Sequence, residues 1–223
     1  MKSWENSPLT DEQKQAILEK ATELFDQILR LYGWDVDEDP NMRETPKRIA
    51  KSWFEIFRGS FDKQPKVTAF PMNEMDYRCP TIEYNSAMGP SVDNPTPIFV
   101  GPIRIFSMCS HHFLPIIGYA YVEYRPNHQK VVGLSKIPRL VDWIARRPMI
   151  QEKFTELVTR TIHKVTEGAP VYVYVEAKHL CAAMRGAEEE NALMITEYYI
   201  DYRPHEIEAA RRKVMNARKD ISL

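Results

Sequence analysis

Residues 98–125 read IFVGPIRIFSMCSHHFLPIIGYAYVEYR and contain two runs, 98–108 and 116–125, that are rich in β-branched and aromatic residues. Such runs are typical of β-strands. A third run of this kind covers 130–134, and Pro126-Asn127-His128 before it has the composition of a turn. The stretch therefore predicts consecutive antiparallel strands.

Helices are predicted before and after these strands. A capping box that starts at Thr10 precedes apolar residues at helical spacing over 10–32. A second helix has Thr45 as its N-cap, Pro46 in its first turn and Gly59 as its stop. Periodicity predicts further helices over 135–146, 150–167 and 204–218, and further strands over 171–181 and 193–202. This order is an α+β pattern built on an antiparallel sheet.

The length of 223 residues suits one compact domain with added helices. We expect an N-terminal helical arm over 1–60 and a catalytic domain with a C-terminal helix over 98–223. Between them, residues 61–97 carry recurrent prolines among polar residues without a stable period. This pattern predicts an irregular excursion with room for one short strand.

Charge and hydropathy exclude several classes of partner. The chain has 30 Lys and Arg residues against 31 Asp and Glu residues, so its net charge favours neither nucleic acid nor an anionic membrane. The first residues lack the apolar run of a signal peptide, and no later stretch has the length of a membrane span. Three cysteines are too few for a disulfide scaffold. We expect a cytoplasmic protein with thiols available for metal or chemistry.

Metal-capable side chains occur at two places in the chain. Cys109 and His112 interrupt a predicted strand, and a turn there would bring both side chains to one side. His179 and Cys181 alternate onto one face at the end of the predicted strand 171–181. Each pair alone is also compatible with buried structural residues. Together, Cys109, His112 and Cys181 fit tetrahedral zinc with a position left for water, as in catalytic sites.

A candidate anion site lies at the predicted start of the helix 135–146. Ser135 can cap this helix, and Lys136 and Arg139, three residues apart, project from the same end. Amide groups at a helix start and two cations together attract an anion. Arg185, four residues after Cys181, adds a third cation. By pattern alone, these residues fit a charged, solvated helix face better than an anion site.

Five separated segments resemble, in order and at matching intervals, the motif set of the GTP cyclohydrolase I family. They are residues 44–51, 109–112 and 133–139, Arg147-Pro148 with Gln151-Glu152, and His179-Leu180-Cys181 with Met184-Arg185-Gly186. The resemblance covers roughly residues 42–200. It implies the tunnelling fold, an antiparallel four-stranded sheet with two antiparallel helices on one side. It also implies a homodecamer of two pentamers, with active sites at subunit interfaces.

The resemblance implies a role for each residue of the reaction centre. Zinc would be held by Cys109, His112 and Cys181, and the water that it acidifies would attack C8 of GTP. His111 would donate a proton during opening of the imidazole ring. After formate leaves, His179 and Ser135 would move protons while the ribose rearranges and the ring recloses. The product would be 7,8-dihydroneopterin triphosphate, the first intermediate of a folate, tetrahydrobiopterin or deazaguanine pathway.

The resemblance likewise implies how GTP is held. Glu152, with Gln151, would face the guanine edge, where a carboxylate accepts hydrogen bonds that adenine cannot donate. The triphosphate would bind the cations Lys136, Arg139 and Arg185, joined by Arg48 and Lys51 of a neighbouring subunit.

One position departs from the family pattern, because Ser110 stands where the family usually has glutamate. Three alternatives stay open at this point. The chain could be a tunnelling-fold enzyme that stops at a ring-opened intermediate, or a deazaguanine nitrile reductase with a cysteine nucleophile and a nicotinamide cofactor. It could also be a non-catalytic zinc-stabilised module that binds nucleotide. His111, His179 and Ser135 argue against the last of these.

Overall fold

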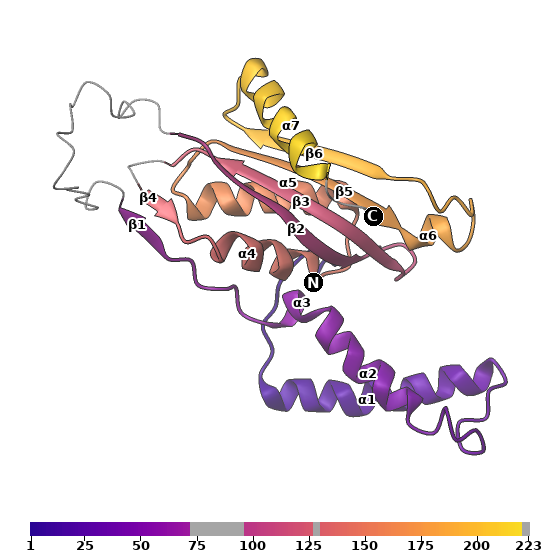
Figure 1. The fold of residues 1–223 in the computed structure, drawn as a ribbon. Coiled ribbons are helices and arrows are strands. Elements are labelled where there is room, and N and C mark those ends of the chain that lie inside the picture. The colour runs from indigo at the N-terminus through magenta and orange to yellow at the C-terminus, as the bar shows by residue number, and fades with distance from the viewer. Residues whose placement is uncertain (72–95, 127–129, 220–223) are drawn as a thin grey trace, which may run out of the picture.

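The computed structural model describes residues 1–71, 96–126 and 130–219 (Figure 1). Most of the Pro-rich excursion, with Cys79, and most of the predicted turn at 126–128 lie outside these ranges. Within the described ranges, no helix has both the length and the apolar character needed to cross a membrane.

A four-stranded antiparallel sheet forms the centre of the fold. Its strands are β2 (Ile98–Met108), β3 (Pro115–Tyr124), β5 (Val171–His179) and β6 (Met194–Ile200), in the order β2-β3-β5-β6. Each neighbouring pair is antiparallel. This arrangement confirms the predicted α+β class and the four-stranded antiparallel sheet.

The third predicted strand does not belong to this sheet. β4 (Lys130–Val132) pairs with β1 (Ala69–Pro71) in a separate two-stranded sheet. The three strands follow one another and pair antiparallel as predicted, but β4 cannot join β3, because both edges of β3 are already taken by β2 and β5. β1 is the short strand for which the irregular excursion left room.

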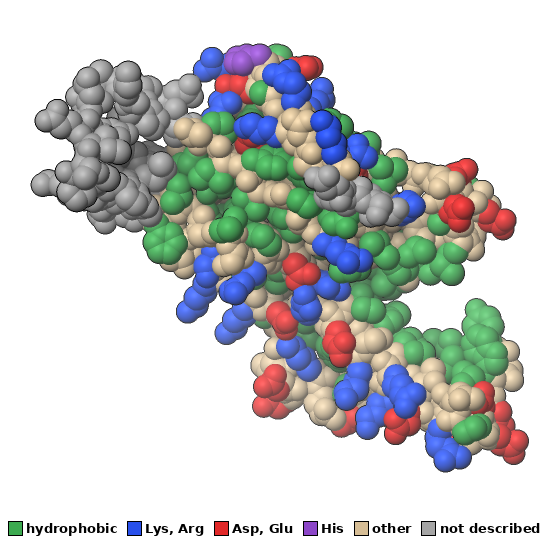
Figure 2. Space-filling view, viewed as in Figure 1, with side chains coloured by type: hydrophobic (Ala, Val, Ile, Leu, Met, Phe, Trp, Pro, Cys, Tyr) green, Lys and Arg blue, Asp and Glu red, His purple; other side chains and the backbone are tan. Residues whose placement is uncertain are grey.

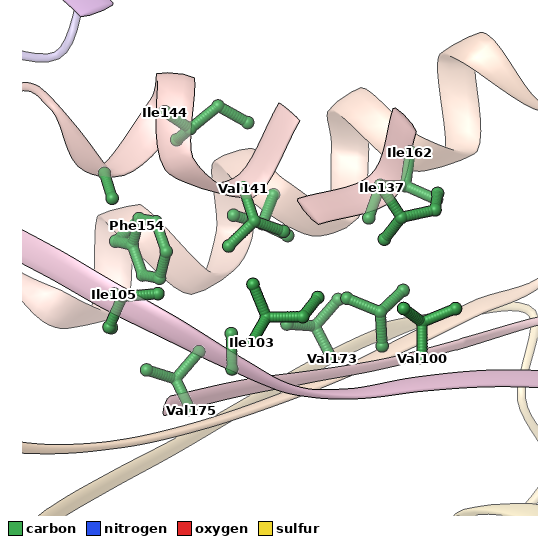
Figure 3. Packing of buried hydrophobic residues seen from close by; sticks show 14 of the residues in the cluster. Val100, Ile103, Ile105, Ile137, Val141, Ile144, Phe154, Ile162, Val173 and Val175 are labelled. Carbon is green, nitrogen blue, oxygen red and sulfur yellow. The ribbon is translucent and has the colours of Figure 1, made fainter. Parts of the chain in front are cut away.

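Two antiparallel helices, α4 (Lys136–Ala145) and α5 (Gln151–Val165), cover one face of the sheet (Figure 1). Aliphatic side chains of the sheet interdigitate with those of both helices to form the main core (Figure 3). Buried members of this core include Val100, Ile103, Ile105, Ile137, Val141, Ile144, Phe154, Ile162, Val173 and Val175. Burial of these side chains is the main force that holds the helices to the sheet.

The C-terminal helix α7 (Pro204–Arg218) packs on the opposite face of the sheet. There, buried tyrosines hydrogen-bond to buried glutamates, and cations of α7 pair with the same carboxylates. Tyr202 donates to Glu123 at 3.2 Å, and Lys213 reaches the other oxygen of Glu123 at 2.5 Å. Because both faces are covered, residues 171–177 of β5 are all buried, instead of alternating.

The N-terminal helices are α1 (Asp11–Leu31), α2 (Thr45–Ile56) and α3 (Arg58–Phe61). The capping box at Thr10 is present, as predicted. Thr45, however, is the first helical residue rather than the cap, and Gly59 lies inside α3 rather than ending the helix. A Cβ on Gly59 would lie 1.9 Å from the carbonyl oxygen of Trp143, so this glycine serves close packing against α4.

The surface of these N-terminal helices is mixed in charge. Figure 2 shows Lys and Arg side chains interspersed with Asp and Glu over this part of the molecule, and hydrophobic side chains gathered at its far end. Exposed apolar residues of this region include Ile17, Leu24, Ile28, Leu31, Tyr32, Trp34 and Trp53. The interspersed charges agree with the balanced composition of the chain.

Candidate active site

The turn predicted at Cys109 and His112 lies between β2 and β3, and we call residues 109–113 the metal turn. Two backbone hydrogen bonds close it: Phe113 N–H donates to the carbonyl of Cys109, and Cys109 N–H donates to the carbonyl of Leu114, both at 2.9 Å. Phe113 adopts a positive φ of 52°. An aromatic residue in this region costs about 1 to 2 kcal/mol, so its surroundings must hold it there.

Cys181 reaches the metal turn from the end of β5, although not as predicted. The strand ends at His179, and Cys181 lies in the short helix α6 (Leu180–Ala183). The prediction of a strand to residue 181 was wrong because β3 starts at Pro115 and its pairing with β5 ends at Ile116 and His179. β5 therefore has no backbone partner beyond His179, and the chain turns.

The structure brings the three expected metal ligands together. The sulfurs of Cys109 and Cys181 and a ring nitrogen of His112 all lie within 4.8 Å of one another. Cys109 Sγ is 4.0 Å from His112 Nδ1. Two ligands of a tetrahedral zinc ion lie about 3.5 Å apart, so a small contraction would suffice for binding.

The protonation chemistry of the thiols is consistent with a cation at this position. Desolvation, together with the neighbouring thiol of Cys109, raises the pKa of Cys181, and the charge of Arg185 opposes this shift. Ionisation of Cys181 in this partly buried site is therefore costly without a cation beside it. A bound metal ion would remove this penalty, because it stabilises both thiolates.

His179 lies beside this cluster and is oriented by Gln151. The buried amide of Gln151 uses its nitrogen to donate to the carbonyls of Val175 and Met194, so its oxygen faces His179 Nε2 at 2.8 Å. His179 must therefore carry its proton on Nε2, which leaves Nδ1 as the acceptor. Burial lowers the pKa of His179, although the charge of Glu152 acts in the opposite direction.

Gln151 and Glu152 lie at the end of the sheet next to the metal turn, because the segment before α5 is hydrogen-bonded to the end of β2. Met149 N–H donates to the carbonyl of Met108 at 3.0 Å. Gln151 is only 2% exposed and points inward, whereas Glu152 is exposed. Glu152 lines an open depression together with Ile150, Lys153, Thr155, Glu156, Thr196, Glu197 and Tyr198. His111 and His112 are both exposed on the metal turn.

Ser135, Lys136 and Arg139 lie toward the opposite end of the sheet. Val132 N–H donates to Tyr124 Oη, and Tyr124 pairs with Ile98 at that end. β2 has 11 residues, so the two ends of the sheet are roughly 30 Å apart. Within one chain, these residues are therefore far from the three metal-capable side chains.

Ser135 occupies the N-cap position of α4, but its hydroxyl makes no capping hydrogen bond. The predicted side-chain cap is wrong for two reasons. Ser135 already has a helical backbone conformation, and the third residue of the helix is Pro138, which has no N–H to donate. The hydroxyl of Ser135 is exposed.

Four of the expected phosphate ligands, Arg139, Arg185, Arg48 and Lys51, are exposed cations, and Lys136 is partly buried. Arg185 lies just after α6, four residues from Cys181. Neither Arg185, Lys136 nor Arg139 forms an ion pair with another described residue. Arg48 and Lys51 lie on α2, where Arg48 contacts Glu44 at 3.3 Å with both side chains about two-thirds exposed. Such a pair contributes little to stability, so Arg48 can exchange partners readily.

Two features of the site were missed by sequence reasoning. Trp53 of α2 stacks on Phe113 of the metal turn, and periodicity indicated Trp53 only as an apolar residue of its helix. Gln151 was expected to face the ligand together with Glu152, and its inward amide has partners on two strands that the sequence does not link to it.

Comparison with known proteins gives a consistent result. The family model described as GTP cyclohydrolase I matches residues 21–218. A protein of Pseudomonas putida named GTP cyclohydrolase 1 1 is 40% identical over 77% of this chain and 80% of its own length. GTP cyclohydrolase 1 of Lactiplantibacillus plantarum is 32% identical over 86% of this chain and 89% of its own length. That of Bacillus mycoides is 36% identical over 78% and 84%.

The match spans α2, the metal turn, α4, α5 and the segment after β5, so it contains every residue of the candidate site. By this match, and by the extent of the identity to the curated relatives, the chain belongs to the GTP cyclohydrolase I family.

Proposed function

We propose that this protein is a zinc-dependent enzyme that hydrolyses GTP at C8, releases formate and recloses the fragments as 7,8-dihydroneopterin triphosphate. The observation that carries the proposal is the meeting of Cys109, His112 and Cys181 within 4.8 Å, next to His179, in a chain of this family. Two thiols and an imidazole favour zinc over magnesium or calcium, which prefer oxygen ligands.

Cys109, His112 and Cys181 would hold the metal ion, with a fourth position free for water. When bound, zinc supplies the positive charge that makes water a nucleophile near neutral pH. Cys109 fixes one side of the site because it is buried, whereas His112 is reached from solvent. The guanine C8 would approach from the exposed side.

The histidines would handle the protons of the reaction. His111 is exposed beside His112 and can donate a proton to the nitrogen that leaves C8 as the imidazole ring opens. His179 presents Nδ1 as an acceptor, since Gln151 holds the Nε2 proton. The lowered pKa of His179 keeps the ring neutral and able to take a proton during the later rearrangement. We assign the side chain of Gln151 to this orienting role.

Glu152 would recognise guanine through two hydrogen bonds from N1–H and the 2-amino group. Glu152→Gln is expected to weaken transition-state binding of GTP by about 1.5 to 3 kcal/mol and so to lower kcat/KM. An amide offers a donor where an acceptor is needed. Steady-state kinetics would measure a decrease of about 10- to 150-fold. The matched control is Glu156→Gln on the same helix, since Lys153 and Arg160 already engage that carboxylate. Equal kinetics for both variants would remove Glu152 from the guanine site.

The triphosphate would bind Lys136, Arg139 and Arg185, with Arg48 and Lys51 from a neighbouring chain. Because Lys136 and Arg139 lie far from Cys181 within one chain, a complete site requires at least two subunits. The edges of β2 and β6 have no strand partner in the described part of the chain, and such edges favour pairing between copies. We therefore propose a homo-oligomer, with two stacked pentamers as its form.

Incubation of the purified protein with GTP tests the proposed function. Formate and the absorbance of the pterin are followed together, and zinc is measured in protein prepared without chelator. We expect one zinc per chain, with formate and pterin appearing in equal amounts. Formate without pterin would identify an enzyme that stops at a ring-opened intermediate. Nucleotide binding without formate would identify a non-catalytic module.

A further inference from the structure

Four aromatic side chains connect the N-terminal helices to the metal turn. Trp53 of α2 stacks on Phe113, with ring centroids 5.5 Å apart and planes 25° from parallel. Phe57, which follows the last residue of α2, meets the same ring edge to face at 5.6 Å. Phe25 of α1 packs edge to face against Trp53 at 5.0 Å. A continuous aromatic contact therefore runs from α1 through α2 to the metal turn.

Phe113 is the residue on which the geometry of the metal turn depends. Its N–H closes the turn onto the carbonyl of Cys109, and its positive φ reverses the chain directly after His112. L-residues rarely adopt this conformation unless surrounding contacts enforce it. Phe113 is 44% exposed and is therefore not held by burial in the core. Its contacts with Trp53 and Phe57 supply the restraint.

Apart from the turn itself, His112 meets the exposed ring of His111 edge to face, with ring centroids 6.1 Å apart. Its side chain is exposed, and within the described ranges its only polar contact is the 4.0 Å approach of Nδ1 to Cys109. The direction of its ring is therefore set by the backbone of the turn. In contrast, Cys109 is buried and Cys181 lies on α6, so both are placed without help from α2.

We propose that Trp53 is a positioning residue, which holds Phe113 so that the metal turn presents His112 toward Cys109 and Cys181. This inference rests on the proposed metal site. It makes metal affinity depend on a side chain of α2 that is not itself one of the three metal-capable side chains. It also makes the N-terminal helices part of the machinery that assembles the metal site.

Zinc affinity of the full-length variants, measured by competition with a chromophoric chelator, tests the proposal. Trp53→Ala is expected to bind zinc about 10- to 100-fold more weakly, which is the usual effect of losing a group that orients a metal ligand. Trp53→Phe keeps an aromatic ring for stacking and should restore the affinity to within a few-fold of wild type. The matched control is Trp34→Ala, since Trp34 is exposed between α1 and α2 and, among the described residues, stacks on Tyr32 alone.

Cobalt substitution gives a second readout. Thiolate-to-cobalt charge-transfer bands should persist in Trp53→Ala, while the ligand-field bands change as His112 loosens. Phe113→Ala should weaken zinc binding as much as Trp53→Ala does, and the double variant should show no further loss, because both remove the same contact. If Trp53→Ala folds poorly, Phe113→Ala alone tests the same contact from the side of the metal turn.

The outcomes separate the two proposals. If wild-type protein binds no zinc, both the metal site and the positioning role fail. If wild type binds zinc and Trp53→Ala binds it equally well, only the positioning role fails. Additive losses in the double variant, or an equal loss in Trp34→Ala, would likewise overturn it, because they would indicate a general disturbance of the N-terminal helices.

Discussion

His112→Ala is expected to yield protein without bound zinc and with no detectable formate release from GTP. A site with three protein ligands loses most of its affinity when one is removed, and the nucleophile is then no longer generated. The neighbouring variant His111→Ala should keep one zinc per chain. Its rate of ring opening should decrease by about 10² to 10⁴, the usual contribution of a general acid.

These two adjacent substitutions control for each other, because both remove an exposed imidazole from the same turn. Metal content and single-turnover formate release would be measured on both, with GTP binding as the third readout. The assignment of roles requires that GTP still binds His111→Ala. Zinc-free His111→Ala together with fully loaded His112→Ala would show that the turn presents the other imidazole to the metal.

Local pattern predicted most elements of this fold because each carries its own periodicity. The strand β2 covers the predicted residues 98–108, and α7 covers 204–218. Errors arose where a distant partner decides the structure. The end of β5 depends on where β3 begins, and the place of β4 depends on β1, some 60 residues earlier in the chain. Neither dependence is visible in a local window.

The candidate site shows the same division. Cys109, His112 and Cys181 could be grouped from their chemistry, and the structure brings them together. The inward turn of Gln151 could not be predicted, because its partners Val175 and Met194 belong to two different strands. The contact between Trp53 and Phe113 joins residues 60 positions apart, for which the sequence has no periodic signal.

The separation of the metal-capable side chains from Lys136 and Arg139 leads to a test of the assembly. If each active site takes its metal ligands from one chain and Lys136 and Arg139 from another, two inactive variants can complement each other. His112→Ala removes a metal ligand and leaves Lys136 and Arg139 intact, whereas Arg139→Ala removes a phosphate ligand and leaves the metal ligands intact. Mixed oligomers of the two should contain some sites in which both halves are intact.

Coexpression of the two variants with different affinity tags, followed by sequential purification on both tags, would supply these mixed oligomers. With random assembly, about one site in two has intact metal ligands, and about one in two of those also has an intact Arg139. Activity should therefore reach about a quarter of wild type. The matched control combines His112→Ala with Cys181→Ala, which damage the same half and should recover nothing. An active site contained in one chain would give no recovery in either mixture, because every chain would then carry a defect in its own site.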